Sequence, residues 1–234
     1  MKTESSASAR YLPFGDTALL IKFGDVISLE VNRKVIALNE AVVKAKVHGV
    51  EEIVPTYRSL LVRYDPLRIS FNQLVFRVKD IEKTLKNIST EKVGRKFAIP
   101  VVYGGEYGPD LGYIAQYHGL TEEQVISLHT GREYRVYMLG FVAGFPYLGE
   151  VADEIATPRL EMPRLKVPAG SVGLAERQTG IYPCEAPGGW QIIGRTPIIL
   201  FDSLQKPPAL LAPGDTVRFK PISEKEFKNG ITRK

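Results

Sequence analysis

The residues best placed to do chemistry lie in the second half of the chain, where prolines alternate with cations. Between Pro158 and Ser171 three prolines separate three positive side chains, Arg159, Arg164 and Lys166. Proline fixes φ and removes a backbone donor, so this stretch predicts a semi-rigid arm that presents its cations. Gly170 and Ser171 end the arm and would add backbone N–H groups and a hydroxyl. Such a set suits a carboxylate or a phosphate.

A second loop of similar composition follows the arm. It runs from Glu185 to Trp190 through a Gly-Gly pair, and Arg195 comes shortly after it. Trp190 could stack on a substrate, although aromatic side chains more often pack into a core. The cations could equally pair with nearby acids and tie barrel loops together. The residues alone leave the anion site and the structural role open.

Two other side chains are candidates for proton transfer. His129 ends a short predicted helix, where it could instead interact with the helix dipole. Asp110 follows the Gly-Pro of a loop and precedes another predicted helix, whose first turn it could simply cap. The three histidines are far apart in sequence, and none has a cysteine neighbour. We therefore expect no metal site, and the sequence contains no phosphate-binding GxxxxGK[ST] loop.

Composition excludes several classes of protein. The 234 residues carry a net charge of +5, and three of the positive charges lie in the last eight residues. The remaining charge is too small to predict a nucleic-acid surface. The longest apolar stretch, 136–149, is broken by glycine and proline and is shorter than a membrane span. With Cys184 as its one cysteine, the chain is expected to be a soluble cytoplasmic protein without a membrane partner.

The first part of the chain, residues 10–92, predicts an α+β domain. A strand over 17–23 precedes a helix that Ser28 caps, and Gly49 is the expected stop of that helix. Two strands follow, over 50–56 and 60–64. Ser70 and Gln73 then form a capping-box pattern that opens a second helix. Strands covered by helices on one face predict a ferredoxin-like layer.

The second part, residues 93–222, is rich in glycine and proline and predicts a mainly-β barrel. The boundary is placed between residues 89 and 97, and residues 223–234 form a basic tail. Two short helices are expected, one over 111–117 and one that Thr121 caps together with Gln124. The expected strands cover 98–103, 134–139, 170–175, 190–193, 197–201 and 216–219.

Five stretches in this order resemble a known family, the B subunits of 5-oxoprolinase, also called the kinase A inhibitor-like or allophanate hydrolase subunit 1 family. They are 11–24, 99–111, 137–149, 163–175 and 182–197. The resemblance implies a small α+β domain followed by a cyclophilin-like barrel. It also implies a protein that acts with two other subunits, A and C, to cleave 5-oxo-L-proline to L-glutamate with ATP, giving ADP and phosphate.

The resemblance gives the candidate residues their expected roles. Arg159, Arg164, Lys166 and Arg195 would face developing phosphate charge, while Gly170 and Ser171 would orient the lactam or its carboxylate. His129 and Asp110 would handle protons. ATP would bind together with the partner subunits, and the isolated chain is expected to be inactive.

Two alternatives remain at this stage. Relatives include an inhibitor that binds a sensor histidine kinase, and carboxyltransferase components of urea and allophanate metabolism.

Overall fold

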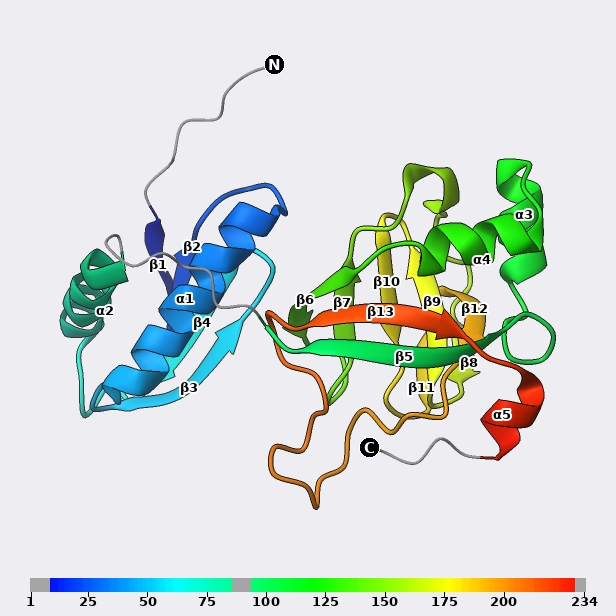
Figure 1. The fold of residues 1–234 in the computed structure, drawn as a ribbon. Coiled ribbons are helices and arrows are strands. Elements are labelled where there is room, and N and C mark those ends of the chain that lie inside the picture. The colour runs from blue at the N-terminus through cyan, green and yellow to red at the C-terminus, as the bar shows by residue number, and fades with distance from the viewer. Residues whose placement is uncertain (1–8, 86–93, 230–234) are drawn as a thin grey trace. The chain divides into compact units, whose positions relative to one another are not determined.

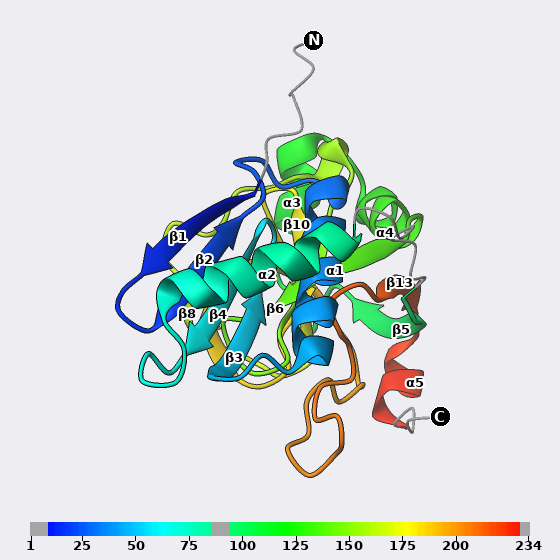
Figure 2. The same ribbon diagram turned by 90° about the vertical axis from the view of Figure 1, so that its left-hand side faces the viewer.

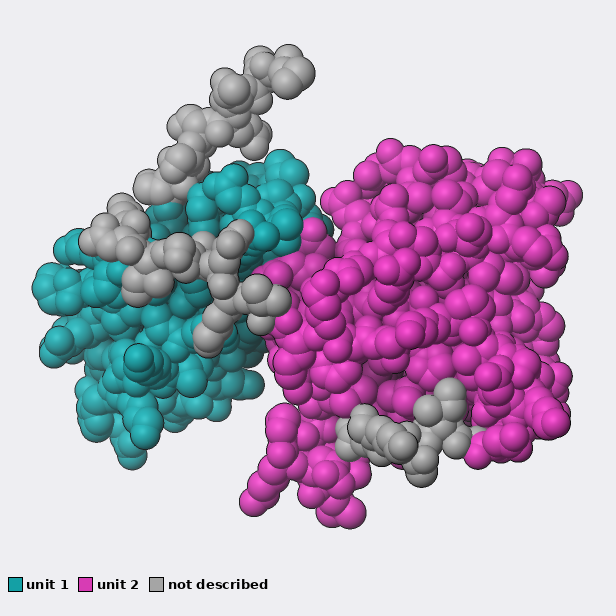
Figure 3. Space-filling view, in the orientation of Figure 1, with its two compact units in different colours: residues 1–92 teal, residues 93–234 magenta. Residues whose placement is uncertain are grey.

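The computed structural model describes residues 9–85 and 94–229 and divides the chain into two compact units. Unit 1 comprises Met1–Lys92 and unit 2 comprises Val93–Lys234, as Figures 1 and 3 show. The predicted boundary falls partly on residues 86–93, which lie outside the described residues. The end of the predicted basic tail, 230–234, lies outside them too, while its start forms helix α5 (Glu224–Lys228).

Unit 1 is a four-stranded antiparallel sheet in the order β1-β2-β4-β3. Its strands are β1 (Arg10–Phe14), β2 (Ala18–Lys22), β3 (Val50–Pro55) and β4 (Ser59–Tyr64). The order β2-β4-β3 is that of three strands of a ferredoxin-like layer. The unpredicted strand β1 occupies the edge where the fourth strand of that layer would lie. The predicted α+β class is therefore confirmed, with its last strand supplied from the N-terminal side.

Helices α1 (Leu29–Ala45) and α2 (Phe71–Leu85) cover this sheet, as Figure 2 shows. Ser28 caps α1 through its hydroxyl, and Ser70 and Gln73 form the expected capping box of α2. The predicted stop at Gly49 was wrong, because α1 ends at Lys46, which adopts the left-handed conformation at φ 45°. Alternate residues of β2 and β4 join the helices in one apolar core.

Unit 2 contains a closed seven-stranded barrel in the order β10-β7-β6-β13-β5-β12-β9. The barrel strands are β5 (Lys96–Tyr103), β6 (Tyr134–Leu139), β7 (Pro146–Gly149), β9 (Ser171–Ala175), β10 (Gln178–Ile181), β12 (Gln191–Arg195) and β13 (Thr216–Pro221). All neighbours are antiparallel except β13 and β5, which are parallel. Closure removes the exposed sheet edges of this unit's main sheet. The mainly-β barrel prediction is confirmed.

The remaining elements of unit 2 decorate the barrel. They are α3 (Leu111–His118), α4 (Glu122–Thr130), the short 3₁₀ helix η1 (Asp153–Ile155), and a two-stranded sheet of β8 (Arg164–Val167) with β11 (Ala186–Gly188). Thr121 and Gln124 form the predicted capping box of α4. The strand predicted over 197–201 was wrong, because this prolyl segment forms only one bridge, between Phe201 and Ala209.

A buried carboxylate fastens the start of the barrel to the turn before its last strand. Asp215 accepts hydrogen bonds from the Arg95 backbone at 3.0 Å, from the Arg95 guanidinium at 2.6 Å, and from the Ala212 backbone at 2.9 Å. Asp215 itself is 4% exposed. These bonds lie next to Thr216 and Lys96, the first residue pair of the parallel β13–β5 ladder, and so hold the two strands in register.

We expect Asp215→Ala to lower the free energy of unfolding by about 2–4 kcal/mol, because two backbone donors and one guanidinium lose their acceptor. Urea unfolding followed by circular dichroism measures this loss. Glu51→Ala is the control, because its ion pair with Arg63 is largely exposed and is worth at most about 1 kcal/mol. Equal effects of the two substitutions would contradict this account of the clamp.

Candidate functional site

Four aromatic side chains form a cluster in unit 2, and three of them, Phe145, Tyr182 and Trp190, are buried. Phe145 lies 5.1 Å from Tyr182, 5.4 Å from Trp190 and 4.9 Å from Tyr147, measured between ring centroids. The first two of these contacts are edge-to-face. The rings come from three separate segments, namely the entry to β7, the end of β10 and the residue before β12. The cluster is therefore built by the barrel, and its edge-to-face contacts fix the ring orientations.

Glycines in the adjoining strands make room for these rings. A Cβ atom at Gly180 would lie 2.9 Å from the Trp190 ring and 3.0 Å from the Phe145 ring. A Cβ at Gly188 would collide with the hydroxyl oxygen of Tyr182. The Gly-rich composition that made these strands hard to predict is thus required by the aromatic cluster.

Two of the predicted cations reach this cluster. The Arg159 guanidinium lies 5.9 Å from the centroid of Trp190, within cation–π range. Arg164, the first residue of β8, donates from Nη2 to Asp110 Oδ1 at 2.6 Å. Its other terminal nitrogen, Nη1, is buried and has no hydrogen-bond partner among the described residues. Arg164 therefore has an unused, buried donor near the aromatic cluster.

Asp110 positions Arg164 rather than capping a helix. It occupies the N-cap position of α3, but its side chain makes no cap hydrogen bond there. Instead Oδ2 accepts from the backbone N–H of Ile192 at 2.6 Å, while Oδ1 binds Arg164. Both carboxylate oxygens are thus engaged, and the residue is 8% exposed. This geometry supports a positioning role for Asp110 and does not support the predicted role in proton transfer.

The electrostatics of the aromatic cluster reflect the two arginines. Burial raises the pKa of the Tyr182 hydroxyl, while the Trp190 backbone hydrogen bond and the charges of Arg159 and Arg164 oppose that rise. Burial also raises the pKa of Tyr147, against the charge of Arg159. Both phenols are therefore neutral near pH 7 and can donate hydrogen bonds. Tyr182 was not singled out by the sequence, although its place in the Tyr182–Trp190 motif was a signal.

The other predicted anion-binding residues do not join this cluster as free groups. Lys166 pairs with Glu185 at 3.2 Å, and both side chains are exposed. Arg195 donates from Nε to the carbonyl of Ala169 at 2.7 Å. These contacts match the alternative in which cations tie loops together.

Gly170 and Ser171 serve the backbone of the barrel. Gly170 adopts φ 82°, and its N–H donates to the Tyr182 carbonyl at 2.7 Å. Ser171 is 2% exposed and pairs with Arg195 at the start of β9. The structure places both beside the loop that carries Tyr182, with their backbone groups already paired.

His129 lies in the barrel core, away from solvent. Its Nδ1 is 2.8 Å from the Tyr103 hydroxyl, its Nε2 is 3.0 Å from Thr179 Oγ1, and its ring stacks on Phe219 at 4.4 Å. Burial lowers its pKa from 6.5 to about 3, so the ring is neutral near pH 7. This environment does not support the predicted catalytic role, because both nitrogens already have protein partners.

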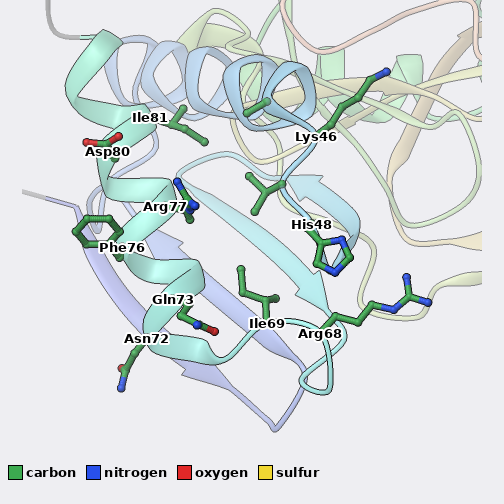
Figure 4. Close-up of a pocket in the computed structure, with 12 residues that line it drawn as sticks. Lys46, His48, Arg68, Ile69, Asn72, Gln73, Phe76, Arg77, Asp80 and Ile81 are labelled. Atoms are coloured by element: carbon green, nitrogen blue, oxygen red, sulfur yellow. The ribbon is translucent and has the colours of Figure 1, made fainter.

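Two hollows among the described residues have other linings than the predicted cations. One, of about 340 Å³, is lined by Leu139–Gly144, directly before the aromatic cluster. Phe141 of this loop is 60% exposed and contacts Phe145 edge-to-face at 5.7 Å. The other, of about 850 Å³, lies in unit 1 and is drawn in Figure 4. The two arginines lie instead at the margin of the mostly buried aromatic cluster.

Comparison with known proteins shows the family. Residues 9–211 match the family model described as carboxyltransferase domain, subdomain C and D. The chain is 44% identical over 223 residues to the 5-oxoprolinase B subunit of Bacillus subtilis, covering 91% of this chain and 92% of that protein. The chain belongs to the family of 5-oxoprolinase B subunits. A more distant relative, urea amidolyase of Lachancea kluyveri, is 25% identical over 97% of this chain and 14% of its own length.

Two solved structures are similar to this chain in sequence and fold. TTHA0988 is 40% identical with a TM-score of 0.79, covering 88% of this chain and 40% of that one. A conserved uncharacterized protein of Pyrococcus horikoshii is 51% identical with a TM-score of 0.56, covering 93% of this chain and 100% of that one.

The motifs that suggested the 5-oxoprolinase family meet at the aromatic cluster. Asp110 comes from the 99–111 motif, Arg164 from 163–175, and the rings from 137–149 and 182–197. In residues 9–85 and 94–229, no group of three His, Cys, Asp or Glu side chains could hold a metal ion. No helix in those residues has the length and hydropathy to cross a membrane.

We expect the burial of His129 to make stability depend on pH. The unfolded ring takes up a proton below pH 6.5, whereas the folded ring resists protonation down to about pH 3. The free energy of unfolding therefore falls with acidification, by about 2 kcal/mol from this residue between pH 8 and pH 5. Urea unfolding at pH 8 and pH 5 should show a smaller fall in the free energy of unfolding for His129→Gln than for the wild type.

The ring itself offers a readout that needs no variant. The side-chain carbon signals of His129 in the wild-type chain should not titrate between pH 5 and pH 8 in NMR spectra. A midpoint in that range would contradict the buried, neutral assignment.

Proposed function

We propose that this chain is the B subunit of an ATP-dependent 5-oxoprolinase, which cleaves 5-oxo-L-proline to L-glutamate with formation of ADP and phosphate. One observation supports the site assignment most strongly. Arg159 and Arg164, predicted as anion-binding residues, both lie at the margin of the cluster formed by Phe145, Tyr182 and Trp190. The exposed edge of this cluster, where Tyr147 is half-buried and Trp190 is 5% exposed, would take a small ring compound that carries one carboxylate.

The substrate has two features that this edge would recognise. Its carboxylate would accept from the unused Nη1 of Arg164, in the charge-assisted geometry that guanidinium groups favour. Its flat lactam ring would lie against Trp190, beside Arg159. The neutral hydroxyl of Tyr147 or Tyr182 would donate to the lactam oxygen. Asp110 would keep Arg164 in place throughout.

The partners A and C would complete the reaction. ATP, when bound with those subunits, would phosphorylate the lactam oxygen with release of ADP. Water would then add to the same carbon, phosphate would leave, and the ring C–N bond would break to give L-glutamate. The part of this chain at the candidate site contributes two cations, and we assign it substrate positioning and stabilisation of developing negative charge. The isolated chain is expected to be inactive.

We expect Arg164→Lys to lower kcat/KM for 5-oxoproline at least 10-fold in the reconstituted three-subunit enzyme, and Arg159→Ala to lower it several-fold. Lysine keeps the charge but not the fork that can bind Asp110 and a carboxylate together. ADP release, measured by a coupled assay, reports the activity. Arg177→Ala is the control, because Arg177 pairs with Glu150 on an exposed surface. Unchanged activity of both site variants would overturn the site assignment.

The name of the matching family model favours a second candidate, a carboxyltransferase component. A carboxyltransferase would form a carboxylated product, whereas a 5-oxoprolinase would open the lactam ring and release ADP. Product analysis of the same reconstituted enzyme, with 5-oxoproline and with urea, separates the two. The kinase-inhibitor alternative stays a prediction.

A further inference from the structure

Unit 1 contains a groove that neither the proposed reaction nor the family assignment uses. It has a volume of about 850 Å³ and lies between the end of α1 and the first turns of α2. Figure 4 shows Arg77 on the α2 side, and Lys46, His48 and Arg68 along the opposite side. The groove is lined by Ala45, Lys46, Val47, His48, Arg68, Ile69, Asn72, Gln73, Phe76, Arg77, Asp80 and Ile81.

Two of the three cations around this groove, Lys46 and Arg77, have no ion-pair partner among the residues that the structure describes. The side chains of Lys46, His48 and Arg77 make no ion pair or hydrogen bond with any described residue. Arg68 pairs with Asp65 at 3.2 Å, and its side chain remains 66% exposed. The one acid among the lining residues, Asp80, faces Lys83 at 3.9 Å. The lining therefore holds three cations, Lys46, Arg68 and Arg77, against one acid, Asp80.

The floor of the groove is apolar, and the exposed ring of Phe76 lies beside it. Val47, Ile69 and Ile81 line the groove and also pack against the core of unit 1. Phe76, on the exposed side of α2, is 67% exposed. An apolar floor between charged walls suits a side chain inserted from an extended or helical segment. Phe76 would gain burial from such an occupant.

We propose that this groove binds an acidic segment of another protein, one that inserts an apolar side chain between α1 and α2. The inference rests on the proposed function, because the segment is assigned to one of the partner subunits. Figure 4 shows Arg77 apart from Lys46 and Arg68, so an acidic chain is better placed than a single small anion to contact all three. Charge complementarity of this kind steers association and sets register.

A protein segment fits this groove better than a nucleic acid does. The whole chain carries a net charge of only +5, and Asp80 lies on the wall beside Arg77. A sugar-phosphate backbone would also leave the apolar floor unused, whereas a leucine or phenylalanine side chain would cover it.

The test compares two identical changes on exposed helix positions. Arg77→Glu reverses a charge on the groove, and Arg33→Glu reverses one on α1 outside the groove lining. Biolayer interferometry measures the affinity of each chain for the purified A and C subunits at 50 mM and 300 mM salt. We expect Arg77→Glu to lower the affinity for one of the two partners at least 10-fold at low salt, and Arg33→Glu to change it less than 2-fold. Added salt should narrow the difference.

A second variant and an activity assay make the outcome unambiguous. Lys46→Glu should weaken binding in the same way, and thermal melts of all variants should match the wild type. If the wild-type mixture hydrolyses 5-oxoproline and both groove variants bind like it, the groove proposal fails while the proposed function stands. If the wild type neither binds nor hydrolyses, both fail. Binding of a 20-nucleotide RNA that Arg77→Glu abolishes, with no effect on the affinity for the partner subunits, would also overturn the proposal.

Discussion

The candidate site depends on the placement of one carboxylate. Asp110 accepts from the Ile192 backbone and from Arg164, at 2.6 Å each, so it joins β12, the start of α3 and β8. A buried carboxylate with two charge-assisted hydrogen bonds keeps its geometry, because the loss of either partner would leave a buried negative charge with fewer hydrogen bonds. Arg164 is consequently held at the edge of the aromatic cluster with Nη1 unused by any described residue. The glycines that make room for Tyr182 and Trp190 allow the rings of this cluster to pack together.

The two arginines could be predicted from the sequence, but their partner could not. Proline-braced cations in the 158–171 arm indicated an anion site, and Arg159 and Arg164 do reach the margin of one aromatic cluster. The bond between Arg164 and Asp110 joins residues 54 positions apart, and local pattern carries no signal for such a pair. Lys166 failed to join them because it pairs with Glu185 on an exposed surface.

Local sequence signals predicted the starts of helices well, because a capping side chain has a direct chemical role there. Three caps, at Ser28, Ser70 and Thr121, begin helices as expected, because their side chains satisfy free backbone N–H groups. Strand prediction was weaker in the barrel. Strand β10 contains Gly180, whose missing side chain makes space for Phe145 and Trp190. Because glycine is not typical of strands, the residues carried no signal for this buried strand. Edge strand β1 was missed although its partner β2 was found.

The described groups at the aromatic cluster favour binding over proton transfer. The phenols of Tyr147 and Tyr182 have raised pKa values, and the core residue His129 is kept neutral by burial. In the proposed function, this cluster would hold and polarise a small carboxylate-bearing ring, while the partner subunits would bring the remaining chemistry.

A crystal structure of the reconstituted three-subunit enzyme with bound 5-oxo-L-proline tests the central claim most directly. The account predicts the substrate carboxylate within about 3 Å of Arg164 Nη1, with its ring against Trp190 and the Asp110 bonds intact. Substrate density at a distance from Arg164, with that guanidinium still bound only to Asp110, would contradict it.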